Sequence, residues 1–358
     1  MKKIIIFRTD RLGDYLIHSR PIYELKKKIS NSQIIVVCSQ INEKILKQTD
    51  YIDQLIIYDK KFSVYIKLKI FFSIIFQTYY STFILDGKNF SYLCNIFLYS
   101  KFKFGISYLS SIKFFTFKIN FHKPSRLYNF FFFTKSEYIT SRKFLKKSEN
   151  FCQKYISLFN FFNLNLKPSD NYIFQTTKVS EVQFETIKKK INLKDYILIH
   201  FDEKWLDIRD LNHELIESIK NLFLEVNKTI ILTSYKNDFE YFEKMKNYFT
   251  YFNLKDSNIE NLSFSNIIIL DNLEIFLLEH FLKNSFINIS CHSGFVVQVC
   301  GANKGKLIDI VNEKDFKWYD CWKPLNTFHK FVFKSTYKTG YLSPSFFFRE
   351  IVNIIKNL

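Results

Sequence analysis

The first part of the chain alternates short apolar runs with longer segments in which apolar residues recur at helical spacing. The runs at residues 3–7, 33–38, 54–58 and 82–85 predict strands, and residues 15–29, 43–48 and 64–79 have the helical period. Short continuous apolar runs are typical of strands buried on both faces, and repeated strand–helix–strand units form parallel sheets covered by helices. The first part is therefore predicted to be an α/β domain.

A second series of the same kind follows the loop-like stretch Asn-Leu-Asn-Leu-Lys-Pro-Ser-Asp at residues 163–170. Strands are predicted at 196–200, 229–233, 267–270, 286–290 and 306–310, helices at 213–226, 238–249 and 273–283, and a last helix at 345–358. A chain of 358 residues also exceeds what one core usually fills. We therefore expect two facing Rossmann-like domains, 1–165 and 171–340, with a cleft between them and ligands beyond the carboxyl ends of the strands.

The sequence lacks the patterns of several other protein classes. It contains neither G-x-G-x-x-G nor G-x-x-x-x-G-K-[ST], the usual dinucleotide and P-loop fingerprints. Its six cysteines form no C-x-x-C pair, so we expect reduced thiols in a cytoplasmic protein and no metal site. Arg8 ends the first apolar run too early for a signal peptide. The apolar run at 70–76 is too short for a bilayer, which needs about 20 residues. A soluble or peripheral protein is expected.

The charge of the chain favours an anionic partner. There are 52 Lys and Arg against 34 Asp and Glu, a net charge of +18. No block of five or six consecutive basic residues and no nucleic-acid-binding motif is present, which argues against nucleic acid. Basic and aromatic residues interleave at 101–126, where Lys123 and Arg126 could bind acceptor phosphates or form a solvated face. The helical stretch at 65–76, with Lys67 and Lys69, could contact a membrane surface or pack in the core.

The turn after the first strand contains the first candidate for catalysis. A transferase that joins a sugar to a hydroxyl needs a carboxylate to take the hydroxyl proton, and Asp14 follows Gly13 at the expected strand end. Asp10 competes for the same role, and Gly13 and Asp10 are also expected to contact the acceptor. The alternative is that Asp14 is only the N-cap of the next helix.

Two further candidates follow strands of the second half. Lys204 comes after the strand at 196–200 and could offset charge on the diphosphate of a leaving group, or be a surface charge. His292, Ser293 and Gly294 join a strand to a helix, where small residues let backbone N–H groups approach a phosphate. The alternatives there are an ordinary turn with Ser293 as cap and a solvated imidazole at His292. His200 and Trp205 are interpreted as packing residues.

Taken in order, these segments resemble glycosyltransferase family 9, the lipopolysaccharide heptosyltransferases. The similarity lies in residues 4–14, which end in Leu-Gly-Asp, in 80–87, 104–106, 197–205 and 290–294, and in the Trp/Pro segment 318–324. The resemblance implies a GT-B fold, a C-terminal helix packed on the first domain, and inverting transfer without a metal or cofactor. It also implies that Asp14 is the base, that Lys204 holds the donor phosphates, and that Ser293 and Gly294 contact the donor.

One departure from the family concerns the donor site. His292 stands where the family has aspartate, and Val297 or Gln298 replaces a histidine. Because the family handles the nucleotide-sugar in this region, the departure leaves UDP-, GDP- or CMP-linked sugars open. The resemblance still makes ADP-heptose the best single expectation for the donor. The expected acceptor is an anionic glycolipid or glycan, such as a lipopolysaccharide core or capsule, at the cytoplasmic face of the inner membrane. A non-catalytic glycan- or nucleotide-binding protein is the alternative from another class.

Overall fold

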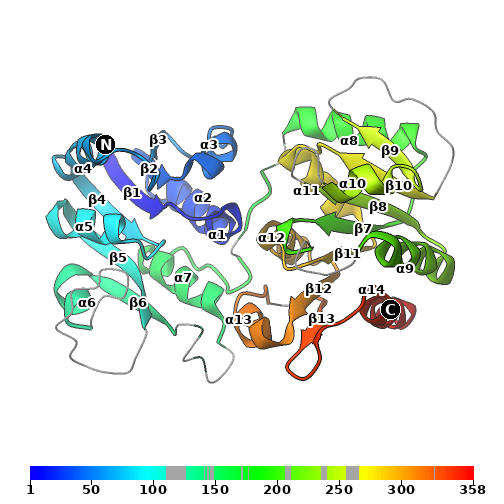
Figure 1. Ribbon diagram of the computed structural model, residues 1–358. Coiled ribbons are helices and arrows are strands. Elements are labelled where there is room, and N and C mark those ends of the chain that lie inside the picture. The colour runs from blue at the N-terminus through cyan, green and yellow to red at the C-terminus, as the bar shows by residue number, and fades with distance from the viewer. Residues whose placement is uncertain are drawn as a thin grey trace. The chain divides into compact units, whose positions relative to one another are not determined.

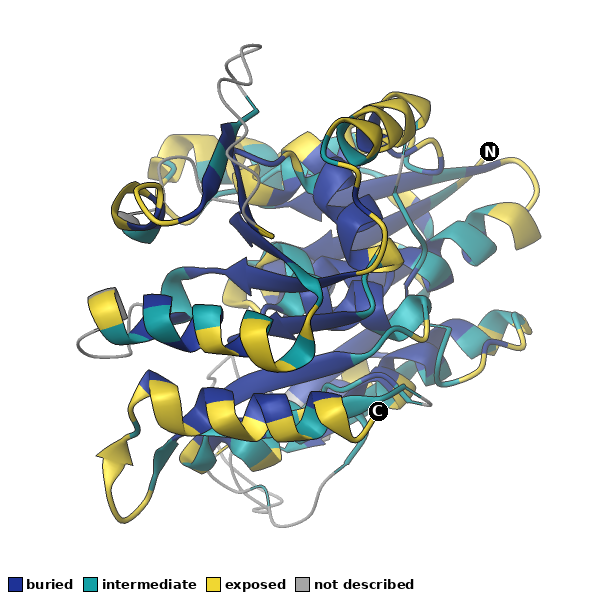
Figure 2. Cartoon of the chain, turned by 90° about the vertical axis from the view of Figure 1, so that its right-hand side faces the viewer, coloured by how far each residue is buried: buried dark blue, intermediate teal, exposed yellow. Residues whose placement is uncertain are grey.

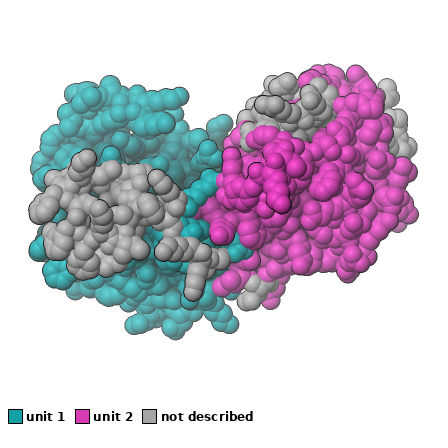
Figure 3. Space-filling view, turned by 60° about the horizontal axis from the view of Figure 1, so that its bottom comes forward, with its two compact units in different colours: residues 1–173, 320–322 teal, residues 174–319, 323–358 magenta. Residues whose placement is uncertain are grey.

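The computed structural model describes residues 1–109, 126–140, 142, 145, 149–170, 172–175, 177–205, 211–234, 240–254, 266–325 and 327–358. These residues form two compact units, coloured separately in Figure 3. Met1–Ile173 together with Asp320–Trp322 make the first unit, and Phe174–Tyr319 together with Lys323–Leu358 make the second.

The first unit is built on a six-stranded sheet in the order β3-β2-β1-β4-β5-β6, with every neighbouring pair parallel. The strands are β1 Lys2–Arg8, β2 Ser32–Cys38, β3 Gln54–Ile57, β4 Thr78–Ile84, β5 Tyr99–Leu109 and β6 Lys135–Thr140. Ile5 of β1 lies opposite both Ile35 of β2 and Thr82 of β4. The strand order thus reverses at β1, and in sheets of this kind ligands bind beyond the carboxyl ends of strands at such a point.

Helices cover this sheet (Figure 1). They are α1 Leu12–Leu16, α2 Ser19–Lys28, α3 Gln40–Leu46, α4 Val64–Ile75, α5 Asn89–Phe97, α6 Arg126–Phe132 and α7 Phe151–Phe159, followed by the 3-10 helix Asn160–Phe162. Alternate residues of the strands, among them Phe7 and Val37, form one buried cluster with Ile74 of α4 and Cys94 of α5. Helices α4 and α5 therefore cover the same face of the sheet.

The segment Asp320–Trp322 completes the first unit from far along the sequence. The Trp322 ring packs edge-on against Phe151 of α7, with 5.1 Å between ring centroids. The Phe151 backbone N–H donates to the Cys321 carbonyl at 2.9 Å, and Cys152 Sγ lies 3.7 Å from the Trp322 carbonyl oxygen. These contacts cover the start of α7.

The second unit contains an eight-stranded sheet in the order β14-β13-β12-β11-β7-β8-β10-β9. Its strands are β7 Tyr196–Phe201, β8 Thr229–Ser234, β9 Thr250–Asn253, β10 Ile267–Asp271, β11 Ile287–Ser290, β12 Leu307–Asn312, β13 His329–Thr336 and β14 Gly340–Tyr341. The β13–β14 pair is antiparallel and the other neighbouring pairs are parallel. The predicted α/β architecture with a parallel sheet in each half is confirmed.

The helices of the second unit are α8 Lys178–Lys190, α9 Leu211–Val226, α10 Glu240–Met245, α11 Ile275–Asn284, α12 Gly294–Ala302, α13 Phe316–Asp320 and α14 Pro344–Lys356, with 3-10 helices at Glu203–Trp205 and Glu313–Asp315. A capping box formed by Thr177 and Ser180 starts α8. Among the described residues, no helix is both long and apolar enough to cross a membrane.

The C-terminal helix α14 belongs to the second unit, which corrects the expectation that it packs on the first domain. Phe347, Ile351 and Ile355 recur every four residues on one face of α14, and that face is buried in the core of the second unit. The helix lies against α9 and β13, and the Ser345 hydroxyl donates to Glu214 Oε1 of α9 at 2.7 Å. Figure 2 shows exposed residues along the outer side of this helix and buried residues along the inner side. An amphipathic pattern predicts that one face is buried, but it does not identify the surface that buries it.

Candidate functional site

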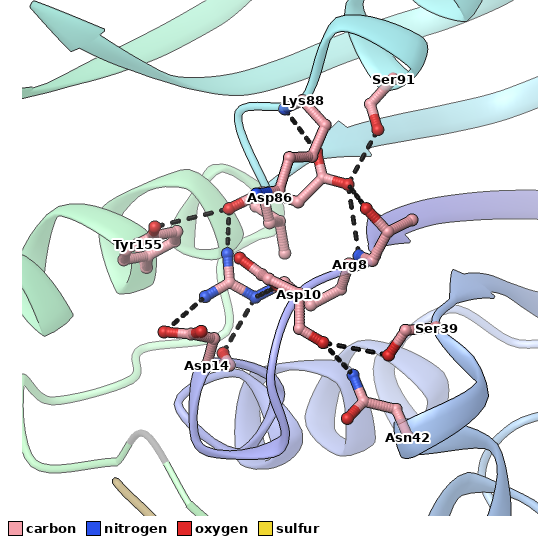
Figure 4. Close-up of polar contacts among 11 residues, drawn as sticks. Arg8, Asp10, Asp14, Ser39, Asn42, Asp86, Lys88, Ser91 and Tyr155 are labelled. Carbon is pink, nitrogen blue, oxygen red and sulfur yellow. Dashed lines mark hydrogen bonds and ion pairs between the residues drawn. The ribbon is translucent and has the colours of Figure 1, made fainter. Parts of the chain in front are cut away.

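A buried arginine organises the polar cluster at the switch point of the first unit (Figure 4). Arg8 is the last residue of β1, and its side chain is 1% exposed. Its guanidinium donates to the Leu85 carbonyl and, through Nε, to the Asp14 carbonyl at 2.9 Å. It also pairs with Asp10 at 3.1 Å and lies 5.5 Å from the centre of the Tyr155 ring. Arg8 therefore ties the turn after β1 to the end of β4.

Asp86 fixes a second link between the same two turns. Its carboxylate accepts from the Thr9 backbone N–H at 3.2 Å and from the Thr9 hydroxyl at 2.7 Å. It also accepts from the Ser91 hydroxyl at 2.8 Å and from the Lys88 backbone N–H at 3.2 Å. Because Asp86 is buried and its oxygens accept these four bonds, we assign it a structural role.

Asp10 is held inside this cluster. Its backbone carbonyl accepts from Ser39 Oγ and from Asn42 Nδ2, both at 3.0 Å. Burial raises the pKa of its carboxyl to about 8, although the Arg8 charge acts in the opposite direction. Because its carboxyl contacts Arg8 and its backbone carbonyl accepts two hydrogen bonds, Asp10 supports the turn.

Asp14 has different surroundings. It is the third residue of α1, its side chain is 38% exposed, and its Oδ1 lies 3.8 Å from the Arg8 guanidinium. The N-cap of α1 is Arg11 and that of α2 is His18, so the alternative that Asp14 is an N-cap is wrong. Asp14 and Gly13 lie within the first helical turn, where the helix dipole favours a negative charge. Asp14 is thus an accessible carboxylate on a rigid support.

The second polar cluster lies at the carboxyl ends of β7 and β11 in the second unit. Lys204, in the 3-10 helix after β7, donates from Nζ to the backbone carbonyl of His292. Lys334 of β13 in turn donates to the Lys204 carbonyl. The Trp205 indole N–H donates to the His200 carbonyl at 2.9 Å, and both rings are fully buried, which fits the packing roles expected for them. The Lys204 ammonium therefore lies at the turn that leads from β11 into α12.

His292 in that turn belongs to a charged network. Its Nδ1 lies 2.7 Å from Asp309 Oδ2, and His329 Nε2 lies 3.1 Å from the same oxygen. The Tyr319 ring stacks on the imidazole with 3.6 Å between centroids. His292 is 9% exposed, so the alternative of a solvated imidazole is wrong. Its φ of 49° is in the left-handed region, which side chains adopt only when surrounding contacts hold them there.

Burial and the neighbouring charges together set the protonation of this network. Burial alone would raise the pKa of the Asp309 carboxyl, but the two histidines hold it below its usual range. Burial lowers the pKa of His292, with Asp309 opposing that effect. A neutral His292 that donates from Nδ1 to an ionised Asp309 leaves its Nε2 as an acceptor.

Ser293 and Gly294 start α12. Ser293 is at the N-cap position, as the alternative of an ordinary turn assumes. Its side chain, however, makes no capping hydrogen bond. The first N–H groups of a helix have no partner within the helix and attract anions. This helix end and the Lys204 ammonium meet at the same turn, an arrangement suited to a diphosphate.

Two candidates for acceptor binding cannot be placed. Lys123 lies outside the described residues, and Arg126 begins α6 with a side chain that is not described. Sequence reasoning missed Arg8, Asp309 and His329. One feature of the sequence could have indicated Arg8, because it is a charged residue at the very end of an apolar run. No such feature indicates Asp309 and His329, because they reach His292 only through the pairing of β11, β12 and β13.

Comparisons with known proteins add information on the fold. No protein-family model and no curated protein matches the chain. A glycosyltransferase family 9 structure from Veillonella parvula aligns with a TM-score of 0.60 and 12% identity, over 93% of this chain and 86% of that one. E. coli heptosyltransferase WaaC with ADP aligns with a TM-score of 0.60 and 13% identity, over 99% of this chain and 98% of that one. A UDP-GlcNAc 2-epimerase from Methanocaldococcus jannaschii aligns with a TM-score of 0.51 and 13% identity, over the full length of both chains. The expected two-domain Rossmann-like fold, and the likeness of that fold to glycosyltransferase family 9, are confirmed.

Proposed function

We propose that this protein is an inverting glycosyltransferase of the cytoplasm that takes a sugar from a nucleotide donor. One observation carries the proposal: the Lys204 ammonium is bonded to the turn at the N-terminus of α12, where a diphosphate would meet both a cation and backbone N–H groups. The fold, which aligns with heptosyltransferases over nearly the whole chain, supports it.

The reaction needs a base, and Asp14 is the proposed one. Its carboxylate takes the proton of the acceptor hydroxyl as that oxygen bonds to C1 of the sugar. The bond from C1 to the diphosphate breaks at the same time, its electron pair goes to the leaving phosphate oxygen, and direct displacement inverts C1. Lys204 and the first N–H groups of α12 stabilise the charge that develops on the diphosphate.

The proposed donor is ADP-heptose and the proposed acceptor is a lipopolysaccharide core or another surface glycan. E. coli WaaC, which has the same fold, was solved with ADP. His292, whose Nε2 is an acceptor when Nδ1 donates to Asp309, would contact the donor together with Ser293 and Gly294. An acceptor at His292 suits a sugar hydroxyl or a nucleobase N–H.

The test combines donor binding with turnover. Asp14→Asn should abolish sugar transfer and keep the thermal stabilisation by donor, because Asp14 acts on the acceptor. Lys204→Ala should weaken donor stabilisation. Asp50→Asn, which changes an exposed carboxylate of the first unit, is the matched control and should behave like the wild type. Normal turnover in Asp14→Asn, or donor bound without transfer to any acceptor, would contradict the proposal. Epimerisation of a nucleotide-sugar without acceptor would favour the epimerase reaction instead.

A further inference from the structure

Helix α4 is apolar on nearly all sides, yet most of it faces solvent. Ile74 is its one fully buried residue, while Val64, Leu68 and Phe72 recur every four residues along an exposed stripe. Phe76, at the C-cap, continues the stripe and is 80% exposed. The sequence left open whether this stretch packs in the core or contacts a membrane. Only the opposite side of the helix packs in the core of the first unit. Ile74 is buried there, and Ile70, Phe71 and Ile75 are partly buried against it.

The exposed stripe continues onto the neighbouring helix. The rings of Phe72 and Phe76 stack with 5.6 Å between centroids, and Phe71 contacts Phe97 of α5 edge-on at 5.9 Å. We define the α4–α5 apolar surface as Val64, Tyr65, Leu68, Phe72, Phe76 and Phe97, all of which are exposed. Contiguous apolar surface of this kind is unusual on a soluble protein and marks a site of interaction.

The charge around this surface is one-sided. From Lys60 to Leu109 the chain holds seven lysines and a single acidic residue, Asp86. Asp86 is buried and its carboxylate is hydrogen-bonded within the polar cluster around Arg8, so it does not offset these charges at the surface. Lys60 and Lys61 precede α4 and Lys69 lies on it, and all three are exposed. Lysines therefore outnumber carboxylates in the segment that carries this exposed apolar stripe.

We propose that the α4–α5 apolar surface docks on a bilayer that contains anionic phospholipid. Apolar side chains enter the boundary between headgroups and acyl chains, and the lysines around them bind anionic headgroups. Since α4 spans only Val64–Ile75, it lies in the interface and does not cross the bilayer. A second copy of the chain is the less favoured occupant, because pairing two such surfaces would bring like-charged lysines together.

This proposal stands without the transfer reaction. Where the proposed function holds as well, the docked unit is the one that carries Asp14, which makes a lipid-linked acceptor the expected substrate class. Vesicle binding and sugar transfer are measured separately, so that failure of one does not imply failure of the other.

The experiment is flotation of the full chain with vesicles of phosphatidylcholine, with and without phosphatidylglycerol. The wild type should float only with the anionic vesicles, and increasing salt should weaken that binding. Leu68→Ser combined with Phe72→Ser should lower the partition coefficient about tenfold or more, since both side chains enter the lipid in the docked state. Lys61→Gln combined with Lys69→Gln should weaken binding mainly at low salt.

Val179→Ser combined with Val182→Ser is the matched control, because these residues of α8 are 67% and 66% exposed in the other unit. It should float like the wild type. Unchanged thermal unfolding of the Leu68/Phe72 variant shows that it folds, as expected for exposed side chains. Equal flotation of that variant and the wild type would overturn the proposal. A wild-type dimer in light scattering that the variant loses would also overturn it, in favour of a second copy of the chain.

Discussion

Replacing Asp309 by asparagine tests whether a buried charge orients His292. The variant keeps the shape of the side chain but turns an ionised acceptor into a neutral amide. Asp309 Oδ2 accepts from His292 at 2.7 Å and from His329 at 3.1 Å in a fully buried position. A hydrogen bond to a charged group contributes about 1.5–3 kcal/mol, and an amide oxygen retains part of that. Relief from burying a charge offsets some of the loss.

We expect Asp309→Asn to lower the free energy of unfolding by about 1–3 kcal/mol. Loss of a fixed imidazole should also weaken donor binding about tenfold, which corresponds to about 1.4 kcal/mol. Urea unfolding followed by tryptophan fluorescence measures the first effect, and titration with donor measures the second. Asp195→Asn, which changes an exposed carboxylate paired with Lys228, is the control and should alter neither.

The pKa of His292 gives a separate readout. The Asp309 charge raises that pKa against the effect of burial, so the pKa of His292 should fall further in Asp309→Asn. Nitrogen NMR of the imidazole follows both the pKa and the Nδ1–H tautomer. An unchanged tautomer and pKa, with wild-type stability, would refute the idea that Asp309 holds His292 in place.

Two further predictions concern the second unit. Glu279 of α11 is buried and accepts from the Gln175 backbone N–H at 3.1 Å, and burial raises its pKa to about 8. Between about pH 4.5 and pH 8 the Glu279 carboxyl therefore keeps its proton in the folded state and has lost it in the unfolded state. The free energy of unfolding should fall as pH rises through this window, and Glu279→Gln should flatten that slope in urea unfolding. Gly301 of α12 leaves no room for a methyl group, because a Cβ there would lie 2.2 Å from Pro324 Cγ. Gly301→Ala should cost about 1–3 kcal/mol, and Gly305→Ala, where the nearest atom is at 3.6 Å, is the comparison; equal stability of the two variants would contradict the packing argument.

The alternation of apolar runs predicted the strands β1 to β4, β7, β8 and β10 to β12, because a strand buried on both faces has few alternatives as a sequence pattern. It did not predict β5, β6, β9, β13 and β14. It also located Asp14, Lys204 and His292, since a parallel sheet brings strand ends to one edge. What the pattern could not predict were contacts between residues that are distant in sequence. Asp309 reaches His292 only because Ser290 of β11 and Asp309 of β12 share a register position. The roles of these residues in binding and catalysis stay predictions.

The packing of α14 shows a second limit. The spacing of Phe347, Ile351 and Ile355 predicts that one face of α14 is buried. From the resemblance to a known family we expected that face to pack on the first domain. The second unit buries it, because α9 and β13 present the apolar surface that it covers. Helix α4 is the opposite case, since an apolar sequence there remains at the surface.

The position of Asp320–Trp322 in the first unit has a consequence for biosynthesis. The ribosome makes Met1–Ile173 first, but the residues that cover Phe151 and Cys152 emerge only after most of the second unit has been translated. The first unit therefore cannot finish folding as an independent nascent domain, and a fragment that ends at residue 173 would expose the start of α7. The polypeptide also passes from one unit to the other three times, so a single proteolytic nick near residue 173 would leave Asp320–Trp322 on the fragment that carries the second unit, and only non-covalent contacts would then hold this segment to α7.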